Sequence, residues 1–173
     1  AGLGETIASA RAAGLQTVGA GRVPERHAPL VLERGGVRTA VFALFERDDP
    51  EPGRVDRRPG LSLVRPEAFD AIAAARESAD AVVAVVHFVD ELRRDPPPRI
   101  RRLARRLVRA GADVVALHGP HVVGPVERVR AGGREAIAAY SLGNLVSDMG
   151  MRASPRRRSG RRADKWHRAA ARA

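Results

Sequence analysis

The sequence predicts an α/β protein with a mixed β-sheet and helices packed over its faces. Two observations support this fold class. Apolar runs typical of buried strands alternate with helical patterns in the middle of the chain, which favours parallel strands. On either side of that region, two β-type runs are separated by Gly-Gly, which is a hairpin signal. With 173 residues, 44% of them hydrophobic, the chain is long enough for one domain with a sizeable core.

The first third of the chain predicts a helix, a short strand and a hairpin. Apolar residues recur at helical spacing over 3–13, and Gly14 ends that pattern. Residues 15–21 suit a short strand that runs into a glycine turn. Two β-type runs over 29–34 and 37–44 flank Gly35-Gly36 and predict a hairpin. The stretch 46–65 is rich in Asp, Pro, Gly and Arg, so we expect a long surface loop there.

The rest of the chain up to residue 140 alternates helices and strands. Pro66 fits the first turn of a helix, and Asp95 before proline fits an N-cap. The continuous apolar run after Asp80 is typical of a strand buried on both faces. The expected elements are a helix over 66–78, a strand over 80–86, a helix from 95 to 110, a strand over 114–117 and a hairpin over 125–131 and 134–140.

Charge and composition narrow the classes of function. The chain has no cysteine, so a metal would have to be held by His, carboxylate or amide groups. The net charge is +11, of which about +8 lies in residues 151–173, where nine Arg and Lys face one Asp. We expect that basic tail to be disordered. Aromatic residues make up 3% of the chain, which offers no stacking platform and disfavours nucleic acid as a partner.

No segment has the roughly 18 apolar residues that a membrane-spanning helix needs. The start of the chain lacks a basic region followed by an apolar run, so no signal peptide is predicted. The chain opens directly into a helical pattern at Gly2, from which we expect that sequence is missing upstream. The compartment therefore stays open.

Polar residues with metal-binding chemistry collect where the predicted strands end. His87 directly follows one apolar run, His118 directly follows the next, and His121 comes three residues later. Ligands in α/β sheets bind at the carboxyl ends of strands, and imidazole is a common metal ligand. Glu91 could add a carboxylate ligand or a general base. The alternative is that these histidines are hydrogen-bonded structural residues, and the spacing alone leaves both readings open.

Two further patterns favour structural readings. The predicted helix before Gly111 carries six arginines, which we interpret as a solvated face with Ile100, Leu103, Ala104 and Leu107 turned to the core. The glycine-rich stretch 18–22 lacks a full dinucleotide fingerprint, so a turn is favoured over a phosphate site.

Four motifs resemble those of the CapA family of poly-γ-glutamate and capsule synthesis proteins. Residues 111–122, GADVVALHGPHV, are similar to that family's GADVVIGHGPHV stretch. Residues 140–146 resemble its YSLGNF motif, and 87–92 resemble HWGxEY. Residues 17–21 fit its early glycine turn. The motifs occur in the family's order and together cover roughly residues 3–148.

The resemblance implies an αββα sandwich similar to that of metallophosphatases, with a divalent metal site, which could be dinuclear, at the edge of the sheet. Residues 1–150 would be part of such a domain, incomplete at its N-terminus. His87, His118 and His121 would be metal residues, with His87 and Glu91 in catalytic roles. Ser141 and Asn144 would shape the adjacent turn or line the pocket.

The implied function is capsule or poly-γ-glutamate biosynthesis with a metal-dependent, phosphoesterase-type hydrolase site. The implied partners are an anionic polymer or phosphoester substrate and the synthesis machinery, and the family points to the cell envelope. This sequence departs from the pattern at Phe88-Val89, where the family has Trp-Gly, and at Leu92 and Leu117. The family's early Asp and Asn-Asn-His motifs, which supply further ligands, have no match here. The alternatives are a non-catalytic remnant or fragment, or a basic polyanion-binding protein.

Overall fold

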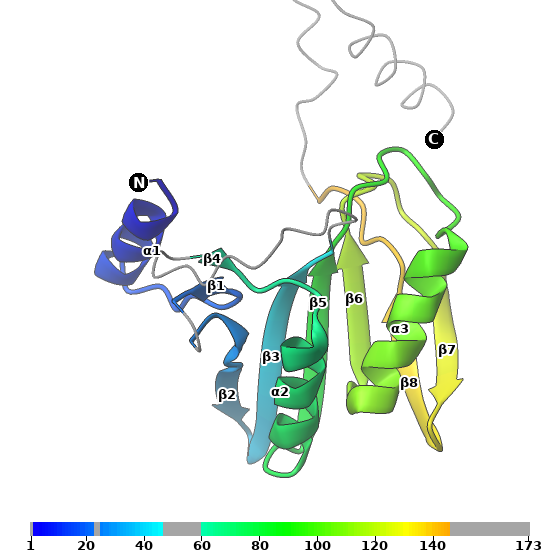
Figure 1. Cartoon of the computed structure of the whole chain (residues 1–173), viewed down its shortest axis with the longest axis horizontal. Helices are drawn as coiled ribbons and strands as arrows, with labels where there is room; N and C mark the ends of the chain where they lie inside the picture. The colour runs from blue at the N-terminus through cyan, green and yellow to red at the C-terminus, as the bar shows by residue number, and fades with distance from the viewer. Residues whose placement is uncertain (1, 23–24, 47–59, 146–173) are drawn as a thin grey trace, which may run out of the picture.

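The computed structural model describes residues 2–22, 25–46 and 60–145, and it confirms the mixed α/β class, consistent with a metallophosphatase-like fold (Figure 1). The elements are α1 (Gly2–Ala12), β1 (Ala20–Gly21), a 3-10 turn (Glu25–His27), β2 (Leu30–Arg34), β3 (Val37–Phe45), β4 (Gly60–Leu61), α2 (Pro66–Arg76), β5 (Ala81–His87), α3 (Pro98–Ala110), β6 (Val114–His118), β7 (Val126–Ala131) and β8 (Arg134–Ala139).

A six-stranded mixed sheet organises the molecule. Its strand order is β2-β3-β5-β6-β8-β7. The inner strands β3, β5, β6 and β8 run parallel, and the two edge strands pair antiparallel with their neighbours. Both hairpins expected from Gly-Gly are present, as β2–β3 and β7–β8. Because the inner strands are parallel, their carboxyl ends meet at one edge of the sheet.

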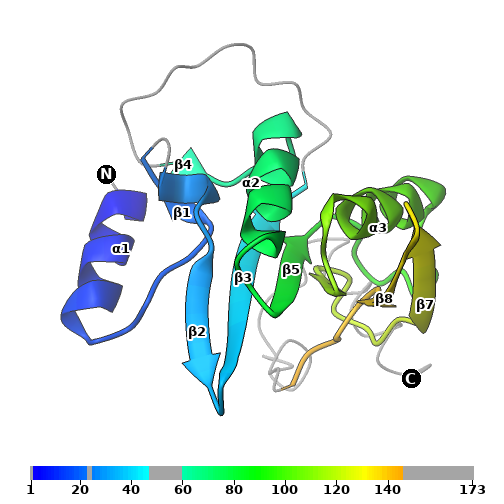
Figure 2. The ribbon, with the colours of Figure 1, turned by 90° about the horizontal axis from the view of Figure 1, so that it is seen from below.

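Helices α2 and α3 cover the same face of this sheet (Figures 1 and 2). Strand residues alternate between faces, so every second side chain of β3 and β5 lies under the helices. Phe42, Val82 and Leu117 are essentially unexposed there. Full burial of side chains of this size contributes about 1.5–3 kcal/mol each. The other face is also apolar, but the described helices leave it half-exposed.

That half-exposed face qualifies one expectation. The run 80–86 predicts a strand buried on both faces, and β5 does form. Its burial pattern alternates, with Val83 and Val85 only partly buried. A continuous apolar run indicates that both faces of a strand are compatible with burial. Within the described residues, only one face of β5 is covered.

Helix α3 begins two residues later than the sequence predicts. Its N-cap is Pro97, in an extended conformation at φ −64° and ψ 157°, and not Asp95. The residue before a proline is pushed out of the helical region. Since Pro96, Pro97 and Pro98 follow one another, the chain can first turn helical at Pro98. Ile100, Leu103, Ala104 and Leu107 are buried as expected.

Asp113 ties together the opposite edge of the sheet, where the parallel strands begin. Its carboxylate accepts hydrogen bonds from Arg76 at the end of α2 (2.9 Å), from Arg134 at the start of β8 (2.7 Å) and from the backbone N–H of Val82 (2.9 Å). Charge-assisted bonds of this kind are the stronger ones in proteins. They fix the starting points of β5, β6 and β8 relative to one another.

Two loop expectations have mixed outcomes. The strand expected over 15–21 is reduced to β1, which pairs with β4 in a separate two-stranded ribbon. Part of the loop expected over 46–65 is therefore a strand, while 47–59 lie outside the described residues. The tail 151–173 also lies outside them, so its predicted disorder remains a prediction.

Candidate functional site

The two strand-end histidines predicted from the sequence are in direct contact. His87 ends β5, His118 ends β6, and the two residues are register partners. Their Nδ1 atoms lie 3.1 Å apart, and their ring centroids 4.8 Å apart. Both side chains lie on the face of the sheet away from α2 and α3, because they continue the half-exposed rows Val83-Val85 and Val114-Ala116.

Phe45 extends this row of rings to a third strand. It pairs in register with His87 at the end of β3, and the two rings stack with centroids 5.2 Å apart and planes 18° apart. The phenyl ring covers one face of the imidazole. His87 is therefore held between Phe45 and His118, with its orientation limited from both sides.

Burial favours the neutral form of both histidines. Desolvation lowers the pKa of His87, and the neighbouring His121 lowers it further. The pKa of His118 is lowered by desolvation first, then by His87 and His121. A neutral imidazole has a lone pair that can bind a metal ion or accept a proton.

Gly119 allows the close approach of the two strand ends. Its φ is +126°, and a Cβ built there would lie 1.9 Å from the carbonyl oxygen of Phe88. No side chain can be accommodated at that distance. The sequence His118-Gly119 is thus required for His87 and His118 to meet.

His121 lies on the loop after β6 and has an uncommon backbone conformation, with φ +64°. Such a conformation costs a residue with a side chain about 1–2 kcal/mol. The Nδ1 atom of His121 lies 2.9 Å from Oδ1 of Asn144. Because an amide oxygen only accepts, Nδ1 carries the proton of this hydrogen bond.

Ser141 shapes the turn that presents Asn144. Its hydroxyl oxygen accepts a hydrogen bond from the backbone N–H of Gly143 at 3.3 Å, and the side chain is buried. Its carbonyl accepts from Gly124 at 3.0 Å, which joins the turn to the loop that carries His121. Of the two roles expected for Ser141, these contacts fit turn formation.

Glu91 lies exposed on the loop after β5. The next residue, Leu92, donates its backbone N–H to the carbonyl of Pro120 at 2.8 Å and has φ +60°. The loops that carry Glu91 and His121 are therefore joined. The catalytic role of Glu91 stays a prediction.

An ion-paired group beside the histidines was not predicted. Arg99 donates to Glu46 at 2.5 Å and also to Asp90, and all three side chains are at most 28% exposed. The backbone N–H of Glu46 donates to the carbonyl of His87 at 2.8 Å. Glu46 directly follows an apolar strand, as His87 and His118 do, so the strand-end rule could have found it.

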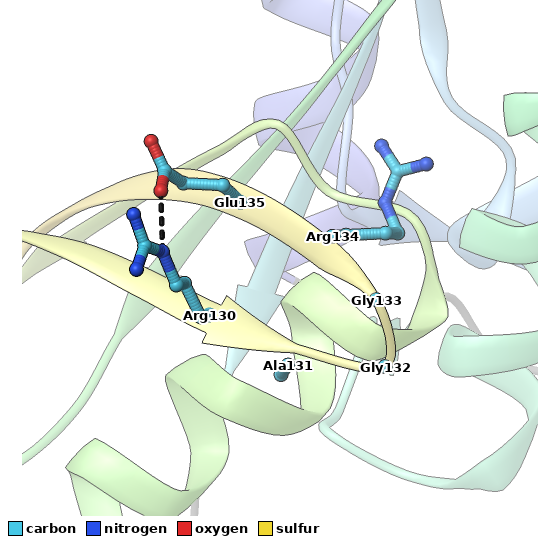
Figure 3. Close-up of a pocket in the computed structure, with 6 residues that line it drawn as sticks. All are labelled: Arg130, Ala131, Gly132, Gly133, Arg134 and Glu135. Carbon is cyan, nitrogen blue, oxygen red and sulfur yellow. Dashed lines mark hydrogen bonds and ion pairs between the residues drawn. The ribbon is translucent and has the colours of Figure 1, made fainter.

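A pocket of about 400 Å³ lies elsewhere, at the β7–β8 turn (Figure 3). It is lined by residues 130–135 and lies at the amino edge of the sheet, opposite the histidines. Its arginines are already paired, Arg130 with Glu135 and Arg134 with Asp113. It therefore offers no chemistry comparable to the histidine edge.

The donor set at the histidine edge is incomplete as a metal centre. Within 2–22, 25–46 and 60–145, no three His, Asp or Glu side chains come close enough together to hold an ion. The structure brings His87 and His118 together, with His121 near enough to affect their pKa values. Further ligands would have to come from outside the described residues.

Comparison with known proteins agrees with the motifs at this edge. The model of a family described as bacterial capsule synthesis protein PGA_cap matches residues 1–149. The chain belongs to this family. The match to the PGA_cap family includes His87, His118, His121 and Asn144, and it confirms the resemblance from which CapA membership was inferred.

Two relatives in the PGA_cap family carry names that refer to polymer synthesis. The chain is 41% identical over 93 residues to "PGA biosynthesis protein CapA" of Bacillus subtilis (strain 168), a match over 53% of this chain and 23% of that protein. It is 32% identical over 155 residues to "Capsule biosynthesis protein CapA" of Bacillus anthracis, over 86% of this chain and 37% of that protein. The matched parts are thus a minor share of both relatives. No helix in the described part of this chain could cross a membrane.

Proposed function

We propose that this chain is part of a CapA-type protein in capsule or poly-γ-glutamate biosynthesis, and that its histidine edge belongs to a metal-dependent hydrolase site of the phosphoesterase type. The contact between His87 and His118 carries this proposal. Two imidazole nitrogens face one another at the carboxyl edge of a parallel sheet, where α/β proteins bind their ligands.

The donor geometry is compatible with a bound divalent cation. Two nitrogens that bind one ion at about 2.0–2.1 Å lie roughly 2.9–3.4 Å apart, for bond angles between 90° and tetrahedral. The separation of 3.1 Å between the two Nδ1 atoms, which join the rings in a hydrogen bond in this structure, falls within that range. The lowered pKa values of both rings favour the neutral form that a metal requires. His87, His118 and His121 would hold one ion or part of a two-ion site.

A bound ion would supply Lewis acidity and an activated water for attack on a phosphoester. The residues of this chain would position that chemistry. His118 and His121 would bind, and His87 would bind or donate a proton to the leaving group. Asn144 would fix the ring of His121, Phe45 would keep water from one face of His87, and Arg99 would hold the end of β3 beside them.

One observation favours a second reading, in which the chain is a non-catalytic remnant or a fragment of the domain. The described residues bring only two of the expected ligands into contact and contain no group of three. A site with two histidines would bind a cation weakly, because structural and catalytic zinc sites use three or four protein ligands.

Elemental analysis of the purified chain separates the two readings. We expect stoichiometric divalent metal in the parent and its loss in a His118→Ala/His121→Ala variant. His27→Gln is the matched control, because His27 contacts Ser62 and Arg26 and lies on a different part of the fold. A folded parent without metal would favour the remnant.

Activity gives the second measurement. Hydrolysis of a simple phosphodiester by the parent should require all three histidines of the edge. If phosphodiesterase activity survived removal of His87, His118 and His121 together, the assignment of this site would be wrong.

A further inference from the structure

The outer face of α3 carries positive charge that no carboxylate of the described chain balances. The helix contains six arginines and no acidic residue. Arg99 and Arg101 form ion pairs with Glu46, Asp90 and Glu127. Arg102, Arg105 and Arg109 are exposed and make no hydrogen bond or ion pair to a carboxylate within 2–22, 25–46 and 60–145.

These three arginines, here called the α3 stripe, share one side of the helix. Positions 102, 105 and 109 are three and four residues apart, which places neighbouring Cβ atoms about 5–6 Å apart. The stripe is about 10 Å long at 1.5 Å per residue. Between its members, Arg106 lies over the ring of Phe69, with the guanidinium carbon 4.4 Å from the ring centroid.

Unbalanced like charges at this spacing oppose one another and weaken a helix. The protein offsets that repulsion elsewhere on α3 with partners, as at Arg99 and Arg101, but not along the stripe. A polyanion bound along the helix would remove the repulsion. Binding would also release the counterions of the polymer, which makes such contacts favourable and strongly dependent on salt.

We infer that the α3 stripe is a docking surface for a linear polycarboxylate of the γ-linked polyglutamate type. This inference rests on the proposed role in capsule or poly-γ-glutamate biosynthesis. Each guanidinium has a planar fork of donors that matches one carboxylate, so a row of arginines suits a row of carboxylates. In the described part of the chain, two aromatic rings lie against arginines of α3. Phe69 is covered by Arg106, and Tyr140 is buried beneath Arg101, so neither offers an exposed ring for stacking nucleobases.

The position of α3 connects the stripe with the histidine edge. The helix runs antiparallel to the inner strands, so its first turn lies at their carboxyl ends, as Figure 1 shows. There Arg99 bridges Glu46 and Asp90, and Glu46 bonds to the carbonyl of His87. A polymer bound along α3 would therefore extend toward the edge that carries the site.

The test is binding of the full chain to poly-γ-glutamate, measured by titration at low and at physiological salt. Arg102→Gln/Arg105→Gln/Arg109→Gln removes the stripe and keeps the inner methylenes of each side chain. We expect affinity to fall roughly tenfold or more, with a shallower salt dependence. The melting temperature without polymer should be unchanged or higher, since repulsion is relieved.

Two control variants also remove three positive charges, but from other parts of the chain, so they test the effect of net charge alone. Arg11→Gln/Arg22→Gln/Arg34→Gln removes three exposed arginines, from α1, from the residue after β1 and from β2, far from α3. Arg156→Gln/Arg157→Gln/Arg158→Gln removes three from the basic tail. Both should retain most of the affinity. If either control lost as much affinity as the stripe variant, or if the parent bound no polymer, the inference would be overturned.

Two more comparisons separate the alternatives. Tighter binding of the parent to duplex DNA than to poly-γ-glutamate would overturn the polycarboxylate assignment in favour of nucleic acid. His118→Ala/His121→Ala should leave polymer affinity unchanged, because the stripe does not include the histidines. Polymer binding without metal would thus support the docking surface even if the hydrolase proposal failed.

Discussion

Gly119 lies against Phe88 so closely that a single added carbon would lie 1.9 Å from the Phe88 carbonyl oxygen. This contact joins the ends of β5 and β6 and brings His87 to His118. Gly119→Ala would combine that clash with a φ of +126°, so we expect a loss of at least about 3 kcal/mol in the free energy of unfolding. Urea denaturation measures it.

Gly36→Ala is the matched control for this substitution. Gly36 also has a positive φ, +77°, but a Cβ there would meet nothing within 4 Å. Only the backbone conformation is penalised, at about 1 kcal/mol. Equal losses in the two variants would show that the contact with Phe88 is not the reason for glycine at 119.

Arg99→Gln should destabilise the fold by about 1–3 kcal/mol, because it leaves Glu46 and Asp90 without their shared partner in a partly buried position. Arg101→Gln, on the same helix, breaks a more exposed pair with Glu127 and should cost less than about 1 kcal/mol. Denaturant unfolding of both variants gives the comparison. The reverse order would contradict a supporting role for Arg99.

His27 should make stability depend on pH. Its pKa is lowered, first by burial and then by Arg26, with Arg65 acting in the same direction and Glu67 opposing them. Arg26 donates to Nε2 at 3.3 Å, so Nδ1–H donates to Ser62 at 2.8 Å, and a second proton has no favourable place.

Because the native state binds this proton more weakly than the unfolded chain, the stabilisation is complete above the unfolded pKa of about 6.5 and is lost as pH falls below it. Chemical denaturation between pH 5 and 8 should show a steeper decline for the parent than for His27→Gln. Parallel curves would show that His27 does not contribute.

Asn144→Ala should weaken divalent metal binding roughly 10- to 100-fold if His121 is a ligand, since partners of ligand histidines have effects of this size. The substitution removes the acceptor that places the proton on Nδ1 of His121. Asn144→Asp keeps an acceptor oxygen and should retain most of the affinity. Calorimetric titration with a divalent metal measures the affinity of the parent and of both variants. Equal affinities in all three proteins would show that Asn144 does not support His121 as a metal ligand.

Much of the structure at the histidine edge could be predicted from local sequence. Polar residues directly after apolar runs predict strand ends, and the parallel arrangement brings His87 and His118 together there. His27 contacts Ser62, which is 35 residues away along the chain. Such a pairing depends on tertiary packing, and no spacing rule anticipates it.

The features that the sequence did not predict correctly have physical causes as well. Asp95 has the chemistry of an N-cap, but three successive prolines delay α3 until Pro98. The pairing of Arg99 with Glu46 joins residues 53 apart in sequence, so the charges alone did not indicate it. Burial of β5 on one face only could not be inferred from a run that is apolar at every position.

The charged residues of β7 limit how the sheet can associate. This strand is an edge of the six-stranded sheet, so its outer backbone groups could pair with a strand from another molecule. Three of its six residues, Glu127, Arg128 and Arg130, are charged, and Arg128 and Arg130 contact Glu135 on β8. An incoming strand would have to desolvate these ion pairs, which protects this side of the protein against aggregation by sheet extension.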